Sequence, residues 1–317
     1  MADQNKGMSD LWRRLRFVFM AIVVYRMGTH IPIPGIDPTR LAALFDQNQG
    51  TILEMFNLFS GGALERMSIF ALNVVPYISS AIIMQLFSNS IPYLQELKKD
   101  GQAGRNQITQ YTRYGTVILA FIQASALAVT LGASGLAYEP GTSFFISAVF
   151  SVVAGTIFLM WLGELISERG IGNGISIIIA TSILTGIPGA IGQALEQARQ
   201  GDLNILLLLG IGVLAMLVIA VVVFIERWQR RITVNYAQRQ QGRKLMQAQA
   251  SHLPFKVNMA GVIPAIFAST FLLFPASLST WFGQAESFGF LQTISLALNP
   301  GQPLYILTFC ALLISFC

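Results

Sequence analysis

The sequence has few charged residues, few histidines and only two cysteines, and these shortages exclude several classes of protein. Charged residues make up 11% of its 317 residues, less than half of the share of about 25% that is usual in soluble domains. Hydrophobic residues make up 54%, and the mean hydropathy is +0.60. This composition predicts an integral membrane protein and not a soluble domain.

The residues that usually carry enzyme or metal chemistry are also scarce. Cys310 and Cys317 both lie in the last apolar segment, so they give no pattern of a disulfide framework. We recognise no phosphate-binding loop, no helical pair of histidines for zinc and no nucleophile with a nearby base. The glycine-rich stretch at residues 170–174 follows a predicted helix, whereas a dinucleotide-binding loop follows a strand. We therefore expect no enzyme activity, no catalytic residue, no cofactor and no metal.

Long uncharged windows recur along the chain, and each is long enough to cross a membrane once. About 20 apolar residues cover the roughly 30 Å of hydrocarbon in a bilayer. The predicted spans are Leu15 to Ile33 and the windows 67–95, 114–138, 140–163, 170–195, 203–225 and 257–285. The expected fold class is therefore an all-α integral membrane protein with seven complete spans.

An eighth span is expected only in part. The breaker at residues 299–303 places its beginning near Leu304, and the sequence ends at Cys317. A helix of that length rises about 21 Å, which is less than the roughly 30 Å required. We therefore expect the sequence to be a fragment that stops inside a span.

Lysines and arginines are distributed unevenly between the two sides of the predicted membrane protein. Sixteen of the twenty lie on one side if the N-terminus is cytoplasmic; the other four are Arg26, Arg40, Arg66 and Arg199. Because positive residues concentrate in cytoplasmic segments, this split predicts a cytoplasmic N-terminus. We interpret Arg26 and His30, near the far end of the first span, as interfacial anchors; a functional role for Arg26 is the alternative.

The second span is interrupted near its start. Gly61-Gly62 separates an apolar cluster from a short turn that carries Glu65 and Arg66, and no charge follows between Met67 and Gln95. Pro76 lies inside this uncharged run, so we expect it either to kink the helix or to leave a backbone carbonyl that neighbouring groups must satisfy. Irregular backbone at membrane depth needs a protein-lined or wet cavity, as in channels and transporters.

The loop between the sixth and seventh spans is strongly basic. Residues 227–256 hold seven lysines and arginines and no acidic residue. The loop could serve only to orient the chain in the membrane. Alternatively, a basic hairpin-like projection suits an acidic partner or RNA phosphates.

A faint internal repeat relates the second and seventh spans. Asn73 to Ile78 and Gly261 to Ile266 both carry valine, an aliphatic residue, proline and isoleucine in the same order. The two spans run in opposite directions in the predicted topology. An inverted repeat leaves this kind of weak match in the sequence. Apolar spans also share such short stretches by chance.

Five specific stretches, spread almost from end to end, closely resemble the SecY family of bacterial Sec protein translocases, and the proteobacterial type in particular. They are IPIPGID (Ile31 to Asp37), MFNLFSGGALERMSIFAL (Met55 to Leu72), ERGIGNGISIII (Glu168 to Ile179), QRRITVNYAQRQQGRK (Gln229 to Lys244) and HLPFKVNMAGVIPAIFAS (His252 to Ser269). The resemblance implies a SecY-type inverted-repeat helical channel. Residues 1–200 would form its first five-span half, and residues 201–317 a C-terminally truncated second half.

The same resemblance implies roles for individual residues by matched position. It places spans two and seven at a lateral gate and a plug at about residues 55–67. The implied pore ring consists of Val74, Ile78, Ile175, Ile179 and Ile266. The implied plug residues are Asn57, Phe59, Gly61, Gly62, Leu64 and Arg66. The implied docking residues for the ribosome and SecA are Arg231, Arg243 and Lys244.

What the resemblance implies for function is a protein-conducting channel subunit. It would move unfolded preproteins across the bacterial cytoplasmic membrane and release membrane proteins sideways into lipid. The implied partners are SecE, SecG, the SecA motor ATPase, the ribosome, signal sequences and membrane lipid. Two alternatives remain at this point: a secondary transporter, which also uses inverted repeats and broken helices, and a membrane scaffold that transports nothing.

Overall fold

The computed structural model divides the chain into two compact units, which are described separately below. The first comprises Met1–Ala190 and Phe267–Ala311, and the second comprises Ile191–Ile266 and Leu312–Cys317. The structure describes residues 2–37, 40–41, 57, 60–139, 141–200, 205–234, 240–241, 244–245, 251–256, 264, 268–269, 271–272 and 302–316.

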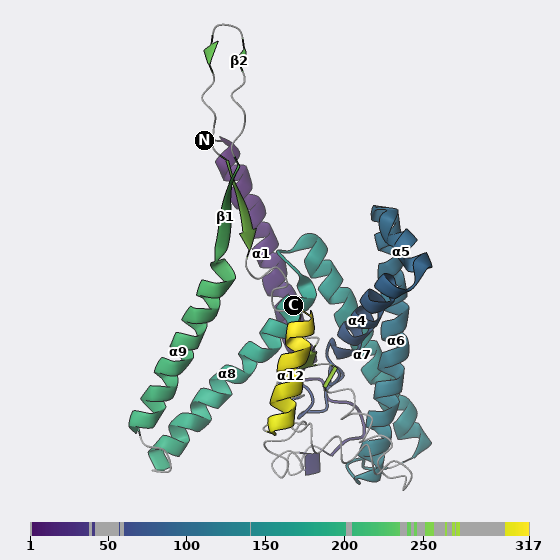
Figure 1. Ribbon diagram of the computed structural model, residues 1–317. Helices are drawn as coiled ribbons and strands as arrows, with labels where there is room; N and C mark the ends of the chain where they lie inside the picture. Colours follow the sequence, from purple (N-terminus) through teal and green to yellow (C-terminus); the bar gives the residue numbers. More distant parts are fainter. Residues whose placement is uncertain are drawn as a thin grey trace. The chain divides into compact units, whose positions relative to one another are not determined.

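Helices dominate the described part of the chain. Their bounds are α1 (Ala2–Gly28), α4 (Val75–Ser90), α5 (Pro92–Lys99), α6 (Gln102–Ala133), α7 (Thr142–Arg169), α8 (Gly174–Gln200), α9 (Ile205–Arg227) and α12 (Pro303–Phe316). In the first unit, α7 lies between α1 and α6, and α6 also packs along α4 (Figure 1). The short helix α5 contacts both α4 and α6.

Four of these helices are long and apolar enough to cross a membrane, so the protein is a multi-pass membrane protein. They are Gln102–Gly132, Thr142–Arg169, Gly174–Gln200 and Leu206–Arg227. They coincide with the third to sixth predicted spans. Helices α1 and α12 cover most of the first predicted span and the start of the eighth, whereas the seventh window lies almost entirely outside the described residues.

The second predicted span differs from expectation in one respect. Residues 61–74 form turns, and α4 begins only at Val75, so Pro76 occupies its first turn. Proline fits there because the first backbone N–H groups of a helix have no partner within the helix. The prediction of a proline kink is therefore wrong: the break precedes the helix, and α4 is 16 residues long.

The core of the first unit joins α6 and α7 to the chain segments on either side of the glycine turn. Buried side chains from α6 and α7, such as Ala128 and Val149, pack with Ile33 from the segment after α1. Leu64 and Met67 from the turn region belong to the same cluster. The irregular region is thus part of the hydrophobic core and not a solvated loop.

The second unit contains the apolar helix α9 and a basic β-hairpin. Strand β1 (Gln229–Val234) pairs antiparallel with β4 (Ser251–Lys256), and β2 (Gln240–Gln241) pairs with β3 (Lys244–Leu245). Both pairings share one register, so they belong to a single hairpin, which extends beyond the end of α9 (Figure 1). The predicted hairpin-like projection is confirmed for these residues.

Close packing between α7 and the turn region gives the first testable prediction. A Cβ atom at Gly155 would collide with the backbone carbonyl of Ile69 and lie 3.1 Å from the Phe70 ring. Gly155→Ala should therefore lower the midpoint of thermal unfolding in detergent, with a cost of about 1–3 kcal/mol from overpacking. At Gly132 in α6 a Cβ would meet nothing within 4 Å, so Gly132→Ala should be neutral or stabilising, because alanine favours helix. Equal midpoints for the two variants would contradict this packing.

Candidate functional site

The candidate site is the glycine turn that follows Ser60, together with the side chains that hold it. Gly61 and Gly62 both have left-handed backbone, with φ of +66° and +79°. A Cβ at Gly61 would lie 3.0 Å from both the Cα of Ser182 and the Oγ1 of Thr185 on α8. Glycine is therefore required at position 61 by its conformation and by its close approach to α8.

Ser60 and Asn57 stabilise this turn from within. The Ser60 hydroxyl donates to the Asn57 carbonyl (3.0 Å) and accepts from the backbone N–H of Leu64 (3.1 Å). The Asn57 amide donates to the Glu65 carboxylate (3.0 Å), while its oxygen accepts from the Glu65 backbone N–H (3.1 Å). These contacts give the two residues the capping role that short polar side chains often have in tight turns.

Two consecutive residues of α1 bind two consecutive carbonyls of the turn. The Tyr25 hydroxyl lies 3.3 Å from the Ser60 carbonyl oxygen, and the Arg26 guanidinium donates to the Gly61 carbonyl (3.1 Å). Buried carbonyls without a partner are costly, so these contacts favour the observed position of the turn. Arg26 thus has a specific partner within the protein, which its interpretation as an interfacial anchor did not anticipate.

Tyr25 also belongs to a buried polar knot, which we define as Tyr25, Asn73 and Ser182. The hydroxyl oxygens of Tyr25 and Ser182 are 2.6 Å apart, and the Asn73 amide donates to Ser182 (3.0 Å). Each of the three side chains is at most 2% exposed. The polar knot therefore connects α1, α8 and the residue immediately before Val74 and α4.

The far end of the turn region is tied to the segment after α1. The backbone N–H of Ile33 donates to the Met67 carbonyl (2.8 Å), and that of Ile69 donates to the Ile31 carbonyl (3.0 Å). Met67 itself has a φ of +41°, which is unusual for a large side chain and indicates local strain. Such a conformation persists only where surrounding contacts enforce it, and here the two backbone bonds do so.

The predicted pore-ring residues that are described lie at the start of α4 and on α8. Val74 and Ile179 are buried, whereas Ile78 and Ile175 are half-buried. Asn73 immediately precedes Val74, and Ser182 follows Ile179 by less than one helical turn, so the Asn73–Ser182 bond brings these two aliphatic positions to the same region. Ile175 packs against Gly163 of α7, and Ile266 lies outside the described residues.

The predicted plug residues are described in part. Gly61, Gly62 and Leu64 lie in the turn region, with Leu64 buried. The Arg66 guanidinium contacts the ring of His30 at 2.6 Å. Phe59 lies outside the described residues.

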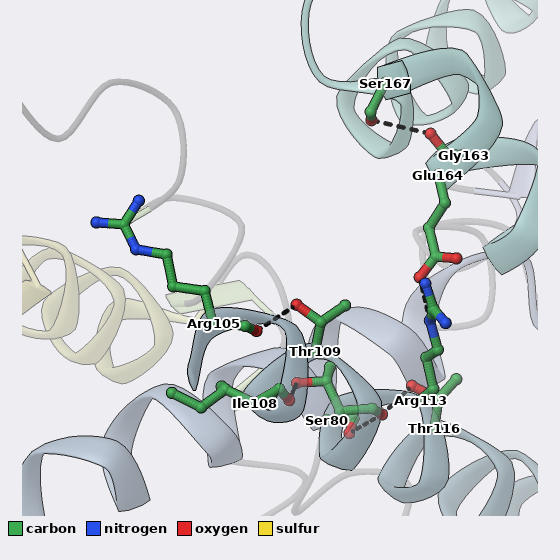
Figure 2. A network of polar contacts seen from close by, with 10 residues as sticks. Ser80, Arg105, Ile108, Thr109, Arg113, Thr116, Gly163, Glu164 and Ser167 are labelled. Atoms are coloured by element: carbon green, nitrogen blue, oxygen red, sulfur yellow. Dashed lines mark hydrogen bonds and ion pairs between the residues drawn. The ribbon is translucent and has the colours of Figure 1, made fainter. Parts of the chain in front are cut away.

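An ion pair that the sequence did not predict joins α6 to α7. The Arg113 guanidinium lies 2.7 Å from the Glu164 carboxylate, as Figure 2 shows. Nearby, the Ser80 hydroxyl of α4 donates to the Thr112 carbonyl of α6 (2.8 Å). The Arg113 side chain remains 43% exposed, so the pair contributes at most about 1 kcal/mol to stability. The signal in the sequence was that Arg113 and Glu164 bound consecutive uncharged windows, which places them at the same end of antiparallel helices.

The basic hairpin presents some of the predicted docking residues. Arg231 is exposed on β1 and pairs with Pro254, while Lys244 lies on β3 opposite Gln241. Arg243 lies outside the described residues. Within the described part of the chain, no group of three or more histidine, cysteine or acidic side chains could hold a metal ion.

Comparisons with known proteins agree with this architecture. A family model described as SecY matches residues 68–317. A protein of Pseudomonas aeruginosa named protein translocase subunit SecY is 63% identical to this chain over 316 residues. The match covers 100% of this chain and 72% of the relative. The Escherichia coli K12 relative of the same name is 58% identical over 315 residues, covering 98% of this chain and 71% of the relative.

Solved structures show the same fold at lower identity. One is described as the structure of a protein conducting channel; it has a TM-score of 0.61 and 20% identity, and the match covers 86% of this chain and 59% of that one. Sec61 in the canine ribosome-channel complex has a TM-score of 0.59 and 19% identity, with the same coverage. This chain therefore spans less than two thirds of the length of these solved channels.

The contacts of Tyr25 give the second prediction. Tyr25→Phe removes the hydroxyl that joins the Ser60 carbonyl to Ser182, so the turn should open more often. Hydrogen exchange of the amides between Ala63 and Ser68 should accelerate about fivefold, as expected for the loss of one hydrogen bond worth about 1 kcal/mol. Tyr114 is exposed on α6, and Tyr114→Phe is the matched control. Identical exchange in both variants would remove the anchoring role of Tyr25.

Proposed function

Because the chain belongs to the SecY family, we propose that it forms part of a protein-conducting channel in the bacterial cytoplasmic membrane, with its N-terminus in the cytoplasm. The channel moves unfolded preproteins across the membrane and releases membrane proteins laterally into lipid. The observation that supports this best is the glycine turn held between α1 and α8, beside the aliphatic residues Val74 and Ile179. A segment that is held by a few hydrogen bonds next to aliphatic side chains is suited to blocking a pore and to leaving it when the pore opens.

In this proposal, the pore ring consists of Val74, Ile78, Ile175, Ile179 and Ile266. Aliphatic side chains make no specific hydrogen bonds, so they can surround a passing polypeptide of any sequence. When no polypeptide is present, a narrow hydrophobic constriction dewets and resists ions. The ring would therefore accept polypeptides of any sequence and still block the passage of ions when it is empty.

The plug, at about residues 55–67, closes the same pore. Its described contacts to α1 are made by the carbonyls of Ser60 and Gly61, and Arg66 contacts His30 in the turn that follows α1. Hydrogen bonds of this kind contribute on the order of 1 kcal/mol each. Their sum holds the plug at rest, yet an inserting polypeptide that provides its own contacts can offset it.

Lateral release requires an opening between helices. We place this gate between the second and seventh spans, α4 and the window 257–285. An apolar segment of the passing chain would leave through the gate because leucine-like residues gain free energy in lipid and charged residues lose it. The Pro76 and Pro264 motifs of these spans then mark corresponding positions in two inverted halves.

The energy for transport comes from partners, because the chain has no enzyme activity of its own in this proposal. The basic hairpin docks the ribosome or the SecA ATPase through Arg231, Arg243 and Lys244, and SecE and SecG complete the membrane complex. The hairpin is suited to this role because it carries exposed positive charge, which attracts RNA phosphates and acidic protein surfaces. A secondary transporter is less well supported. An ion-coupled transporter uses an ionisable side chain within the membrane to bind the ion, whereas the half-buried Glu164 is already paired with Arg113.

The pore ring generates the third prediction. In the full-length protein reconstituted into planar bilayers, Ile78→Asn should raise the resting ion conductance, because a polar side chain favours wetting of the constriction. The matched control is Ile118→Asn on the exposed side of α6, where Ile118 is 61% exposed. That variant should leave conductance unchanged. A ring at Ile78 is excluded if both variants conduct like the parent protein.

The basic hairpin generates the fourth prediction. Arg231→Glu and Lys244→Glu should each weaken ribosome binding to membranes that contain the protein. Each should also reduce the slope of log affinity against log salt by about one, as expected for the loss of one phosphate contact. Cosedimentation at several salt concentrations measures both quantities. Arg199→Glu, on the opposite side in the predicted topology, should change neither, and an equal loss in that control would contradict docking at the hairpin.

A further inference from the structure

Two buried hydroxyl groups of the polar knot make three contacts with one another and with backbone carbonyls. The Tyr25 hydroxyl lies 3.3 Å from the carbonyl oxygen of Ser60 and 2.6 Å from the hydroxyl oxygen of Ser182. The Ser182 hydroxyl also lies 2.9 Å from the carbonyl oxygen of Ile178, one turn earlier in α8. Tyr25 and Ser182 are at most 1% exposed, so bulk water does not reach either hydroxyl.

A count of protons shows that only two of these three contacts can be hydrogen bonds at one time. A carbonyl oxygen can only accept, and each hydroxyl group carries one proton. The protons of Tyr25 and Ser182 must therefore be divided among three contacts. The Asn73 amide donates to the Ser182 oxygen at 3.0 Å, but this bond supplies none of the three.

Two arrangements of the protons keep the short bond between the two hydroxyls. In the first, Ser182 donates to Tyr25, and Tyr25 donates to the Ser60 carbonyl. In the second, Tyr25 donates to Ser182, and Ser182 donates to the Ile178 carbonyl. If neither hydroxyl donated to the other, two oxygens would face each other at 2.6 Å with no proton between them. The first arrangement holds the glycine turn, the second does not, and rotation of the two hydroxyl groups converts one into the other.

Neither arrangement leaves a carbonyl without a donor. The Ile178 carbonyl lies inside α8, where the backbone N–H of Ser182 donates to it. The Ser60 carbonyl accepts from the N–H of Ala63 within the turn, at 3.4 Å. Because a buried polar group without a partner is costly, an exchange that creates none requires little free energy.

We propose that the hydroxyl pair of Tyr25 and Ser182 is a two-position switch, which holds the glycine turn in one position and releases it in the other. Ser182 favours release because it accepts the Tyr25 proton once the Ser60 carbonyl has left. Asn73 stays bound to Ser182 in both positions, so the aliphatic side chains beside it need not move with the turn. A role of the switch in opening a channel rests on the proposed function, whereas the switch itself does not.

Removal of the Ser182 hydroxyl gives a test whose sign is specific to the switch. In a Ser182→Ala variant of the full-length protein, Tyr25 still binds the Ser60 carbonyl, but on release its buried hydroxyl has no acceptor at position 182. Hydrogen exchange of the amides between Ala63 and Ser68 should therefore slow about fivefold or more at fixed pH. A purely structural contact would have the opposite effect, because its loss would loosen the turn. Unchanged or faster exchange in this variant would overturn the proposal.

The matched control removes a neighbouring hydroxyl of the same helix. Thr181 donates to the Ile177 carbonyl (2.8 Å), as Ser182 can donate to Ile178. Thr181→Val removes that bond and leaves both hydroxyls of the switch in place, so exchange in the turn should match the parent protein. Equal slowing in Thr181→Val and Ser182→Ala would assign the effect to α8 in general and overturn the switch.

A double variant tests whether Ser182 acts through Tyr25. Tyr25→Phe alone should accelerate exchange in the turn, since the donor to the Ser60 carbonyl is lost. Addition of Ser182→Ala to Tyr25→Phe should change the rate no further, because residue 25 then has no proton for position 182 to accept. Slowing of the same size in both backgrounds would show that Ser182 acts independently of Tyr25, and would overturn the switch.

Conductance separates the switch from the proposed function. If the protein is a plugged channel, Ser182→Ala in planar bilayers should open about fivefold less often than the parent protein when a synthetic signal peptide is added, and Thr181→Val should open like the parent. Equal opening of Ser182→Ala and the parent would overturn the role of the switch in gating. If the protein forms no channel under any condition, the proposed function fails, while the exchange measurements still decide whether the switch exists.

Discussion

The structure of the candidate site depends on satisfying backbone carbonyls where the chain is not helical. In a bilayer, water does not satisfy exposed backbone groups, so irregular segments at membrane depth need partners from the protein. Here the carbonyls of Ser60 and Gly61 receive donors from Tyr25 and Arg26 of α1. Loss of those donors would leave the two carbonyls without these partners, and the two glycines would permit other conformations of the turn.

The polar knot and the aliphatic residues next to it have complementary roles. Hydrophobic contact alone is non-directional and would allow the turn region to shift between several similar positions. The buried bonds among Tyr25, Asn73 and Ser182 select one of those positions. At the same time, the aliphatic side chains at Val74 and Ile179 keep the neighbourhood apolar. If this region is the proposed seal of a channel, it needs both properties: a defined closed position and contacts weak enough to exchange.

The two units divide their physical tasks. The first buries an irregular segment among packed helices and holds it with directional bonds. The second combines an apolar helix, whose described side chains are almost all exposed, with a hairpin rich in positive charge. A helix that is apolar on all sides is suited to a membrane, and a charged hairpin is suited to an aqueous partner. Between Arg227 and Gln229 the chain therefore changes from an apolar segment suited to the membrane to a charged segment suited to water.

The sequence alone determined the features that depend on composition and spacing. Uncharged windows of sufficient length identified the helices α6 to α9, because the cost of charge in lipid leaves a direct trace in the sequence. Alternation of basic and apolar segments likewise indicated the hairpin, and five specific sequence motifs indicated the SecY family. The glycine pair at Gly61-Gly62 correctly marked the break before the second span, since only glycine adopts its backbone conformation at low cost.

Tertiary structure decided which residues meet across the sequence. Nothing in the local pattern of α1 shows that Tyr25 would contact Ser182, 157 residues away, or that His30 would accept from Arg66. Pro76 was expected to kink a helix, but turns with left-handed backbone at Met67 and Asn73 precede α4, which begins at Val75, so the proline falls in its first turn. Composition and periodicity report the local cost of placing a residue in lipid or water, whereas hydrogen bonds between distant segments depend on packing geometry that is defined only once the helices come together.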